Sequence, residues 1–381
     1  MMKIVVNTIS VKKKSGGAFQ IASNFIRATL LYPVEGVEWF YITSADVDMQ
    51  VGGLFEAEKE RHYFVFPTQP DFRNTYKQVL HELRNWEDYH CPDVIYSISS
   101  PCYFTFKTTE VMRFANAWVT CSNRYAWKTL SVRGKLRMWL YRFNQRRLLQ
   151  KAHYIITQSE AVRQGLLRIT KLPENHVTVI PNVLPEVIKR QPAEPKIVDE
   201  GWIDIACIAA PVSHKNLDII PSVLQMLKER HGVYNVRFHV TIPSEAKLWK
   251  KILMDARGGN VDDRIVNHGY CTQEKLAEIY RSCQICFFPT LLETFSATLL
   301  EAAYFRLNVV ATDFGFNKEI LEDAALYYDP MNANSAADKI ALLMSEEMLR
   351  NDLLEKMSRR ISRYSDYKRH FFETVAFLKS I

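Results

Sequence analysis

Short runs of apolar residues alternate along the chain with longer stretches whose apolar positions recur at helical spacing. The first run, "KIVVNTI", precedes the helix-like "AFQIASNFIRATLLY", and later strand-like runs are "EWFYIT", "HYFVF", "DVIYSI", "AWVTC" and "YIITQS". Strands that alternate with helices favour βαβ units and a parallel sheet. The first half of the chain therefore predicts an α/β domain with a parallel sheet.

The second half repeats this alternation after a segment rich in proline and charge, "KRQPAEPKIVDEG", which we interpret as a linker. The predicted elements are "IDIACIAA", a helix from about Asn216, "VRFHVTI", "RIVNHGY", a helix over 274–282, "ICFFPT", a helix over 296–305, "NVVAT" and "ALYY". Two Rossmann-like domains facing a cleft follow from this pattern. Ligands of such open sheets bind at the carboxyl ends of the strands.

Composition indicates the cellular compartment in which the protein is expected. The chain has 381 residues, of which 48% are hydrophobic and 24% charged, typical of a soluble globular protein. No apolar run is long enough to span a bilayer, and the first strand is too short for a secretory signal. Seven scattered cysteines indicate a reducing compartment, and the pair Cys283 and Cys286 lacks the second pair of a zinc site. We expect a cytoplasmic protein without a bound metal.

One segment, 124–151, departs from the otherwise even charge distribution. It holds nine Lys or Arg residues and no acidic residue, with Trp127, Trp139, Tyr141 and Phe143 between them. Basic and aromatic residues together suit an anionic membrane surface, here the inner face of the cell membrane. The alternative is a solvated helix face whose aromatic residues cover a core. No nucleic-acid motif accompanies the segment, so we expect no nucleic-acid partner.

Candidate chemistry lies in "FFPTLLETFSATLLEAAYF", residues 287–305, which carries two carboxylates in an apolar run. Glu293 falls in the loop between a predicted strand and a predicted helix, where Thr294 or Ser296 is the candidate cap. Unpaired N–H groups at a helix start bind anions such as a phosphate or diphosphate.

The residues around that helix start suit a sugar nucleotide. Ser296, Ala297 and Thr298 are small enough to let a ligand approach the backbone. Glu293 can accept hydrogen bonds from sugar hydroxyls, and Glu301, in the second turn, from a diol such as a ribose. Each glutamate taken singly is better explained as a surface residue or a cap.

Residues 268–330, "HGYCTQEKLAEIYRSCQICFFPTLLETFSATLLEAAYFRLNVVATDFGFNKEILEDAALYYDP", resemble the signature region of family-four glycosyltransferases. These are retaining enzymes of the GT-B fold. The first half matches more loosely through "SGGAFQ", "PDVIYS" and "YIITQSEAVRQGLL". The resemblance implies an N-terminal acceptor domain over 1–190 and a C-terminal nucleotide-sugar domain over 191–362. It also implies that 363–381 form a helix crossing back to the N-terminal domain.

The resemblance also assigns roles to individual residues. It implies that Glu293 contacts the donor sugar, that Glu301 holds the ribose, and that Lys215 binds the diphosphate and offsets charge as the nucleotide leaves. Glu293 and Lys215 are thus the expected catalytic residues. Further substrate-binding positions are those of the loop before the helix, the helix start and the N-terminal loop: Phe295, Ser296, Ala297, Thr298, Gly16 and Gly17.

Three positions depart from the family pattern. Ala210 stands where an arginine is frequent, so the diphosphate is expected to depend more on Lys215 and on His214. Thr and Ser replace the glycines of the family's Glu-Gly-Phe-Gly, which leaves the donor sugar undefined. Ser122 or Asn123 falls where many members carry a histidine near the acceptor.

The sequence therefore predicts a retaining, metal-independent transferase that takes a nucleotide-sugar, preferably a UDP-sugar, as co-substrate and needs no cofactor. The expected acceptor is a glycan or lipid-linked saccharide in cell-surface polysaccharide assembly. Two alternatives stay open: a nucleotide-sugar epimerase of the same fold, and a non-catalytic subunit that binds nucleotide-sugar. A dinucleotide oxidoreductase is disfavoured because no Gly-x-Gly-x-x-Gly follows a strand.

Overall fold

The structure is a computed structural model that describes residues 1–13, 17–55, 62–66, 76–98, 101, 105–195, 201–364 and 366–381. The Cα positions group it into two compact units. Unit 1 comprises Met1–Thr120, Met138–Pro181 and Lys368–Ile381, and unit 2 comprises Cys121–Arg137 and Asn182–Tyr367. The chain thus leaves the first unit after Pro181 and returns to it at Lys368, and residues 121–137 group with the second.

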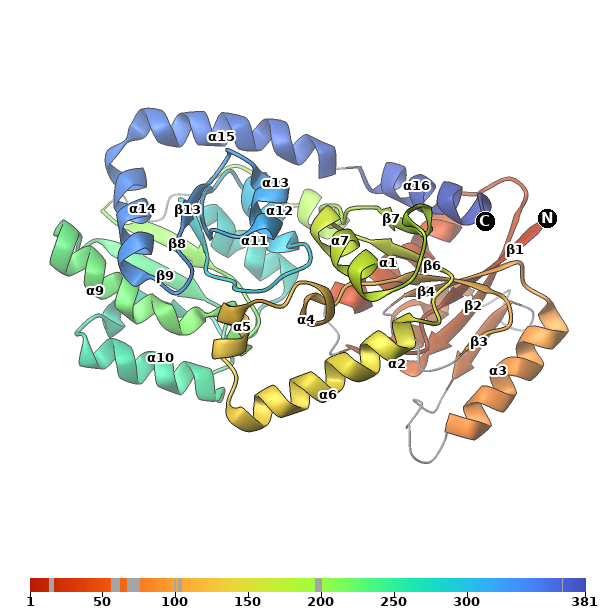
Figure 1. Ribbon diagram of the computed structural model, residues 1–381. Helices are drawn as coiled ribbons and strands as arrows, with labels where there is room; N and C mark the ends of the chain where they lie inside the picture. Colours follow the sequence, from red (N-terminus) through yellow and green to blue (C-terminus); the bar gives the residue numbers. More distant parts are fainter. Residues whose placement is uncertain are drawn as a thin grey trace. The chain divides into compact units, whose positions relative to one another are not determined.

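Unit 1 is built on a seven-stranded sheet in which every strand pair is parallel (Figure 1). The strand order is β3-β2-β1-β4-β5-β6-β7, so the order reverses between β1 and β4. The strands are β1 (Met2–Asn7), β2 (Val37–Ser44), β3 (Tyr63–Phe66), β4 (Val94–Ile98), β5 (Thr109–Arg113), β6 (Tyr154–Thr157) and β7 (Val177–Val179).

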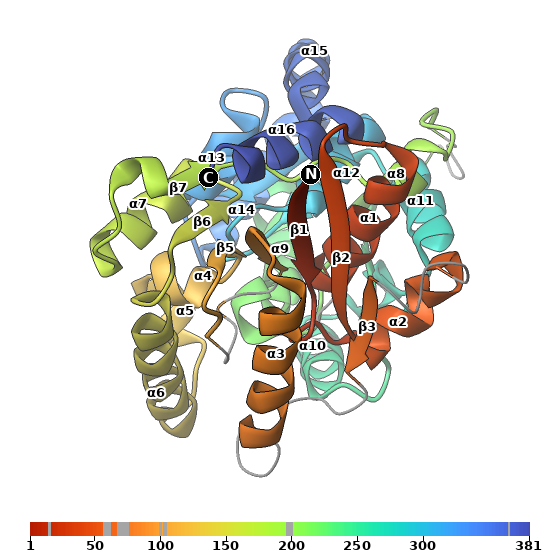
Figure 2. The same cartoon turned by 90° about the vertical axis from the view of Figure 1, so that its right-hand side faces the viewer.

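The helices of unit 1 are α1 (Gly17–Leu31), α2 (Ala45–Val51), α3 (Tyr76–His90), α4 (Ala117–Thr120), α7 (Glu160–Ile169), most of α6 (Val132–Leu149) and α16 (Tyr367–Lys379), with the short 3-10 helices η2 (Gly52–Phe55) and η3 (Glu174–His176). The last helix packs on the first, since the rings of Phe371 and Phe25 lie 5.4 Å apart. Both chain ends accordingly lie close together in Figure 2.

Unit 2 holds a six-stranded parallel sheet of order β10-β9-β8-β11-β12-β13. Its strands are β8 (Ile203–Cys207), β9 (Val236–Val240), β10 (Ile265–Asn267), β11 (Ile285–Phe288), β12 (Asn308–Thr312) and β13 (Leu326–Tyr328). Its helices are α5 (Arg124–Lys128), α8 (Glu186–Lys189), α9 (Ile220–His231), α10 (Lys247–Gly258), α11 (Gln273–Ser282), α12 (Ala297–Tyr304), α13 (Gly315–Leu321), α14 (Ala333–Ser345) and α15 (Glu347–Ile361), with 3-10 helices η4 (Ser213–Lys215), η5 (Leu217–Ile219), η6 (Asp262–Arg264) and η7 (Ser362–Tyr364).

The sheet of unit 2 is covered on both faces, which explains its apolar strands. Successive residues of a strand point to opposite faces. In β11, Ile285 and Phe287 join the core that includes α9 and α14, whereas Cys286 and Phe288 join the core that includes α11 and α12. The prediction of two Rossmann-like α/β domains with parallel sheets is confirmed.

Two local expectations differ from the structure. The run "AWVTC" was expected as a strand, but residues 117–120 form α4, and the strand beside β4 is "TEVMR", residues 109–113. Val119 of this short helix is fully buried, and Thr120 lies directly against Gly165 of α7. The helix expected from about Asn216 begins at Ile220, because Asn216 has a left-handed φ of 54° and ends η4. None of the helices in the described ranges is both long enough and apolar enough to cross a bilayer.

The pair Cys283 and Cys286 belongs to the core. Both thiols are buried and free. Burial raises the pKa of Cys286 to about 12 and that of Cys283 further, so neither thiol ionises at neutral pH. This supports the interpretation of both as structural residues.

A buried histidine predicts an acid-sensitive unit 1. His370 in α16 is 8% exposed, and burial, with the charge of Arg113, lowers its pKa to about 3. Because the unfolded chain binds this proton near pH 6.5 and the folded chain does not, stability falls as the pH drops below 6.5. The loss by pH 5 is about 2 kcal/mol. We expect His370→Gln to flatten this part of the pH dependence, measured by urea unfolding between pH 7 and pH 5.

His81→Gln, an exposed histidine on α3, is the matched control and should keep the wild-type slope. Equal slopes for His370→Gln and the wild type would contradict the assignment.

Candidate functional site

Two loops of unit 2 meet at the carboxyl ends of β8 and β11. These strands are neighbours, and the strand order of the sheet reverses between them. The backbone N–H of Leu291, after β11, donates to the carbonyl of His214, after β8, at 2.8 Å. Such a reversal is where open α/β sheets bind ligands. The candidate site is therefore at this junction.

Lys215 and Glu293, both expected to be catalytic, form an ion pair across these loops. The Lys215 Nζ donates to Glu293 Oε2, and the two side chains are 16% and 22% exposed. The ammonium also lies 5.7 Å from the centre of the Phe288 ring. Low exposure reduces solvent screening, so the pair is stronger than a surface salt bridge. The structure thus brings a cation and a carboxylate together at the switch point.

His214 lies beside this pair as a neutral imidazole. Burial, together with the positive charge of Lys215, lowers its pKa to about 4. It therefore carries no charge at neutral pH. Its backbone carbonyl accepts the bond from Leu291, which makes His214 part of the connection between the loops.

The start of α12 leaves its first N–H groups without a side-chain cap. Ser296 occupies the cap position but makes no capping hydrogen bond. The chain approaches through the buried residues Thr294 and Phe295, and the Phe295 ring contacts that of Tyr364 edge-on at 5.5 Å. Neither Thr294 nor Ser296 has a positive φ, so this backbone path does not require glycine. An uncapped helix start of this kind attracts anions.

Glu301 lies one turn further along α12, where burial raises the pKa of its carboxyl. The hydroxyl of Tyr280 donates to Glu301 Oε2 at 2.9 Å. Tyr280 is fully buried and stacked on Phe305, with ring centres 5.4 Å apart. A rigid phenol therefore fixes the orientation of this carboxylate.

The residues expected near the acceptor have structural contacts in unit 2. Asn123 Oδ1 accepts from the N–H groups of Tyr125 and Ala126, both at 3.0 Å, and so caps α5. Its amide nitrogen donates to the Leu291 carbonyl at 2.7 Å. Asn123 therefore supports the loop that carries Glu293. Ser122, next to it, is half-buried.

Of the two glycines expected in the N-terminal loop, the structure describes Gly17. Gly17 is the exposed first residue of α1 and is not among the glycines with a positive φ. A Cβ placed there would meet no atom within 4 Å. Gly16 lies outside the described residues.

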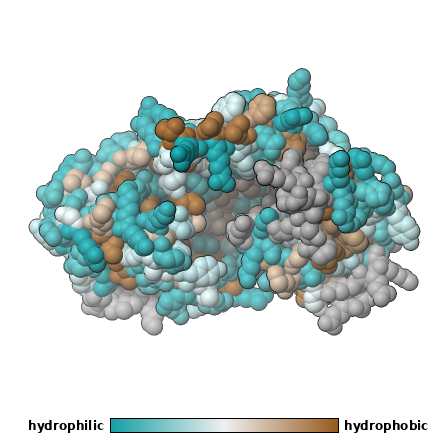
Figure 3. Space-filling view, turned by 90° about the horizontal axis from the view of Figure 1, so that it is seen from below, coloured by the Kyte–Doolittle hydropathy of each residue, from teal (hydrophilic) through white to brown (hydrophobic). Residues whose placement is uncertain are grey.

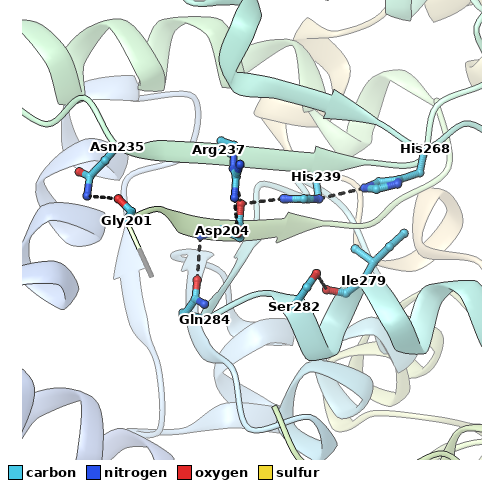
Figure 4. Close-up of polar contacts among 9 residues, drawn as sticks. All are labelled: Gly201, Asp204, Asn235, Arg237, His239, His268, Ile279, Ser282 and Gln284. Atoms are coloured by element: carbon cyan, nitrogen blue, oxygen red, sulfur yellow. Dashed lines mark hydrogen bonds and ion pairs between the residues drawn. The ribbon is translucent and has the colours of Figure 1, made fainter. Parts of the chain in front are cut away.

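Sequence reasoning missed a buried polar chain in the same sheet (Figure 4). Asp204 of β8, 2% exposed, accepts two hydrogen bonds from Arg237 of β9, at 2.8 and 2.9 Å. Its Oδ1 also lies 2.8 Å from His239 Nε2, and His239 Nδ1 lies 2.9 Å from Nε2 of His268. The signal was present in "VRFHV", where Arg237 and His239 alternate with buried apolar residues and so share one face.

The protonation states of these four side chains follow from their burial and from their hydrogen-bond partners. Hydrogen bonds from His239 and Arg237 hold the pKa of Asp204 below its usual value despite burial, and burial, with the nearby His239, lowers the pKa of His268. Asp204 lies in β8, Arg237 and His239 lie in β9, and His268 follows the end of β10 (Figure 4). Within the described ranges no three His, Cys, Asp or Glu side chains are arranged to hold a metal ion. The row links β8 to β9 and to the residue that follows β10.

Comparison with known proteins adds a family match for the second half. Residues 190–361 match the model of the family "Glycosyl transferases group 1". The Schizosaccharomyces pombe protein "Phosphatidylinositol N-acetylglucosaminyltransferase gpi3 subunit" is 21% identical over 198 residues, which cover 52% of this chain and 42% of that protein. The chain thus aligns with less than half of that relative's length.

Solved structures share the whole fold. Sucrose-phosphate synthase from Thermosynechococcus elongatus has a TM-score of 0.72 at 12% identity, over 100% of this chain and 99% of its own. Anabaena HepE, solved with UDP and glucose, has a TM-score of 0.72 at 14% identity, over all of both chains. The predicted GT-B fold is confirmed, and the resemblance to glycosyltransferases is confirmed at the level of the group 1 model. The family-four assignment stays a prediction.

The buried chain of Figure 4 predicts a large stability cost for losing its carboxylate. Asp204→Asn removes the carboxylate that accepts from Arg237 and His239, and each lost hydrogen bond to a charged group costs about 1.5–3 kcal/mol. We expect a loss of this order in the free energy of unfolding, measured by urea titration at pH 7.

Asp218→Asn is the matched control, because Asp218 pairs with Lys251 and their side chains are 34% and 53% exposed. Its loss should stay below about 1 kcal/mol. Equal losses for the two variants would show that the Asp204 chain does not carry the expected energy.

Proposed function

We propose that this chain is a retaining glycosyltransferase that moves a sugar from a nucleotide-sugar to a glycan or lipid-linked saccharide acceptor. The observation that carries the proposal is the ion pair of Lys215 with Glu293 at the carboxyl ends of β8 and β11. A cation for a diphosphate and a carboxylate for sugar hydroxyls are thereby adjacent. The group 1 match over residues 190–361 supports the same class of reaction.

We assign the binding site of the donor to unit 2, where these contacts lie. Its diphosphate binds the uncapped start of α12 and Lys215, where backbone N–H groups and an ammonium offset its charge. Its sugar donates hydroxyl hydrogens to Glu293. Its ribose donates to Glu301, whose carboxylate Tyr280 holds in place. Ala297 and Thr298 are small enough for the phosphate oxygens to reach the backbone.

The proposed transfer requires no nucleophile from the protein. The bond from the anomeric carbon to the diphosphate oxygen breaks, and its electron pair stays on the diphosphate. The acceptor hydroxyl oxygen bonds to the anomeric carbon on the same face of the sugar, and its proton passes to the leaving phosphate oxygen. Lys215 stabilises the charge that develops on the diphosphate, which is the task that a metal ion performs in other transferases.

The finer assignments are a UDP-sugar donor, independence of metal ions and family four. The solved HepE complex with UDP and glucose supports the choice of UDP. We assign the acceptor to cell-surface polysaccharide assembly and the protein to the cytoplasm, with residues 124–151 contacting the inner face of the cell membrane. Gly16, Gly17 and Ser122 are proposed to contact the substrates, and Asn123 to support them through the loop of Leu291.

The first test is a panel of UDP-, GDP- and ADP-sugars with a saccharide acceptor, following nucleotide release and product. We expect one UDP-sugar to be turned over, with retention at the anomeric carbon. Glu301→Gln should raise the KM for that donor by about tenfold or more, since a lost charged hydrogen bond costs about 1.5–3 kcal/mol.

Glu355→Gln on α15, a carboxylate 73% exposed, should behave as the wild type. A converted sugar that stays on the nucleotide would instead identify an epimerase. Nucleotide binding without turnover under every acceptor would identify a non-catalytic subunit.

The ion pair predicts that one substitution has opposite effects on UDP binding and on turnover. Glu293→Gln releases Lys215 from its carboxylate and removes a negative charge beside the diphosphate. We expect UDP to bind about tenfold more tightly, equivalent to roughly 1.4 kcal/mol. Turnover of the donor should nevertheless fall by about a hundredfold, because the developing positive charge on the sugar loses its carboxylate. Calorimetry with UDP and initial rates measure the two effects.

Lys215→Ala is the companion variant and should weaken UDP binding and turnover together. Weaker UDP binding by Glu293→Gln would contradict the assigned competition for Lys215.

A further inference from the structure

One face of α6 exposes a continuous row of large apolar side chains, here called the α6 stripe. Its members are Val132, Leu136, Trp139, Leu140 and Phe143, which are 84%, 62%, 56%, 53% and 62% exposed. They recur at i, i+4, i+7, i+8 and i+11 and so lie within an arc of about 100°. Figure 3 shows hydrophobic residues in a row over the position that α6 has in Figure 1. The stripe is therefore a surface feature.

The opposite face of the same helix already packs on the protein. Leu149 is fully buried and Gln145 is 4% exposed. The Tyr141 hydroxyl, outside the stripe, accepts a hydrogen bond from the Asn116 amide at 2.7 Å. Within the stripe, the rings of Trp139 and Phe143 stack on each other, 6.1 Å apart. The core thus uses one face of α6, and the side chains of the stripe on the other face stay exposed.

Exposed positive charges border the stripe. Lys135 lies on one side of it and Arg133 and Arg137 on the other, and all three are exposed. No acidic residue occurs anywhere between Glu110 and Glu160. The helix and the segments next to it in the sequence therefore carry positive charge with no acidic residue among them.

We propose that the α6 stripe docks on the surface of an anionic lipid bilayer. Trp139, Phe143 and the aliphatic side chains would enter the boundary between head groups and acyl chains, while the flanking Lys and Arg contact lipid phosphates. A second copy of the chain fits less well, because two positive borders would be brought together. The proposal narrows the contact from 124–151 to α6, and it rests on the proposed function only for the lipid-linked acceptor that such docking would present.

The test is co-sedimentation of the full chain with vesicles of neutral phosphatidylcholine, alone or with about one third phosphatidylglycerol. We expect binding to the anionic vesicles only, and a loss of that binding at high salt. Trp139→Ser with Phe143→Ser should reduce it by about tenfold or more, since each buried aromatic contributes through its apolar area. Arg133→Gln with Arg137→Gln should reduce it similarly.

Lys247→Gln with Lys250→Gln removes the same charge from exposed positions of α10 and is the matched control. The control should bind vesicles as the wild type does, and all variants should keep the wild-type thermal midpoint and UDP affinity. Failure of the wild type to bind UDP would contradict the proposed function without touching this inference.

Three outcomes would overturn the docking proposal. Equal vesicle binding by the stripe variants and the control would remove the stripe from the contact. Wild-type dimers that the Trp139 and Phe143 substitutions dissociate, without vesicle binding, would assign the stripe to self-association. Loss of vesicle binding by the Arg133 and Arg137 substitutions but not by the Trp139 and Phe143 substitutions would indicate attraction to polyanions in general.

Discussion

The parallel pairing of β8 with β11 is the constraint on which the candidate site depends. These strands lie 80 residues apart in the chain, yet the backbone N–H of Asp204 donates to the Gln284 side chain and Gln284 N–H returns a bond to the Asp204 carbonyl. The sheet can be parallel only because helices cover both of its faces. Once the two strands are neighbours, the loops after them lie side by side, which brings Lys215 within reach of Glu293.

Rigid support behind the loops maintains that meeting. Leu291 is the shared anchor, since its N–H binds the His214 carbonyl and its own carbonyl accepts from Asn123. On the other side of β8, Asp204 ties β9 to the sheet through Arg237 and His239. A half-buried ion pair is sensitive to small displacements, because its Coulomb energy changes steeply where solvent screening is weak. Fixed loops therefore matter more here than at an exposed salt bridge.

Most of the fold could be predicted from the sequence, because strand and helix periods alternate clearly in both halves. The failures were local: "AWVTC" has a strand-like composition, yet it forms a short helix that buries Val119 and lies against Gly165 of α7. The Asp204 row could not be derived, because Asp204, His239 and His268 are adjacent only through strand order. The pairing of Lys215 with Glu293 was likewise beyond the sequence, which placed both residues at one site without indicating that they bind each other.

The two glutamates of "ETFSATLLE" occupy different electrostatic environments, and this difference divides the chemistry between them. Glu293 forms an ion pair with the ammonium of Lys215. A ligand that binds Lys215 in its place must also compensate the charge of Glu293, as a sugar with developing positive charge does. Glu301 accepts a hydrogen bond from a neutral phenol, and burial raises the pKa of its carboxyl. A carboxylate of that kind gains most from neutral donors such as a diol, which satisfy its oxygens without adding charge. The helix start between them, rich in N–H donors, is then the natural position for the anionic part of one extended ligand.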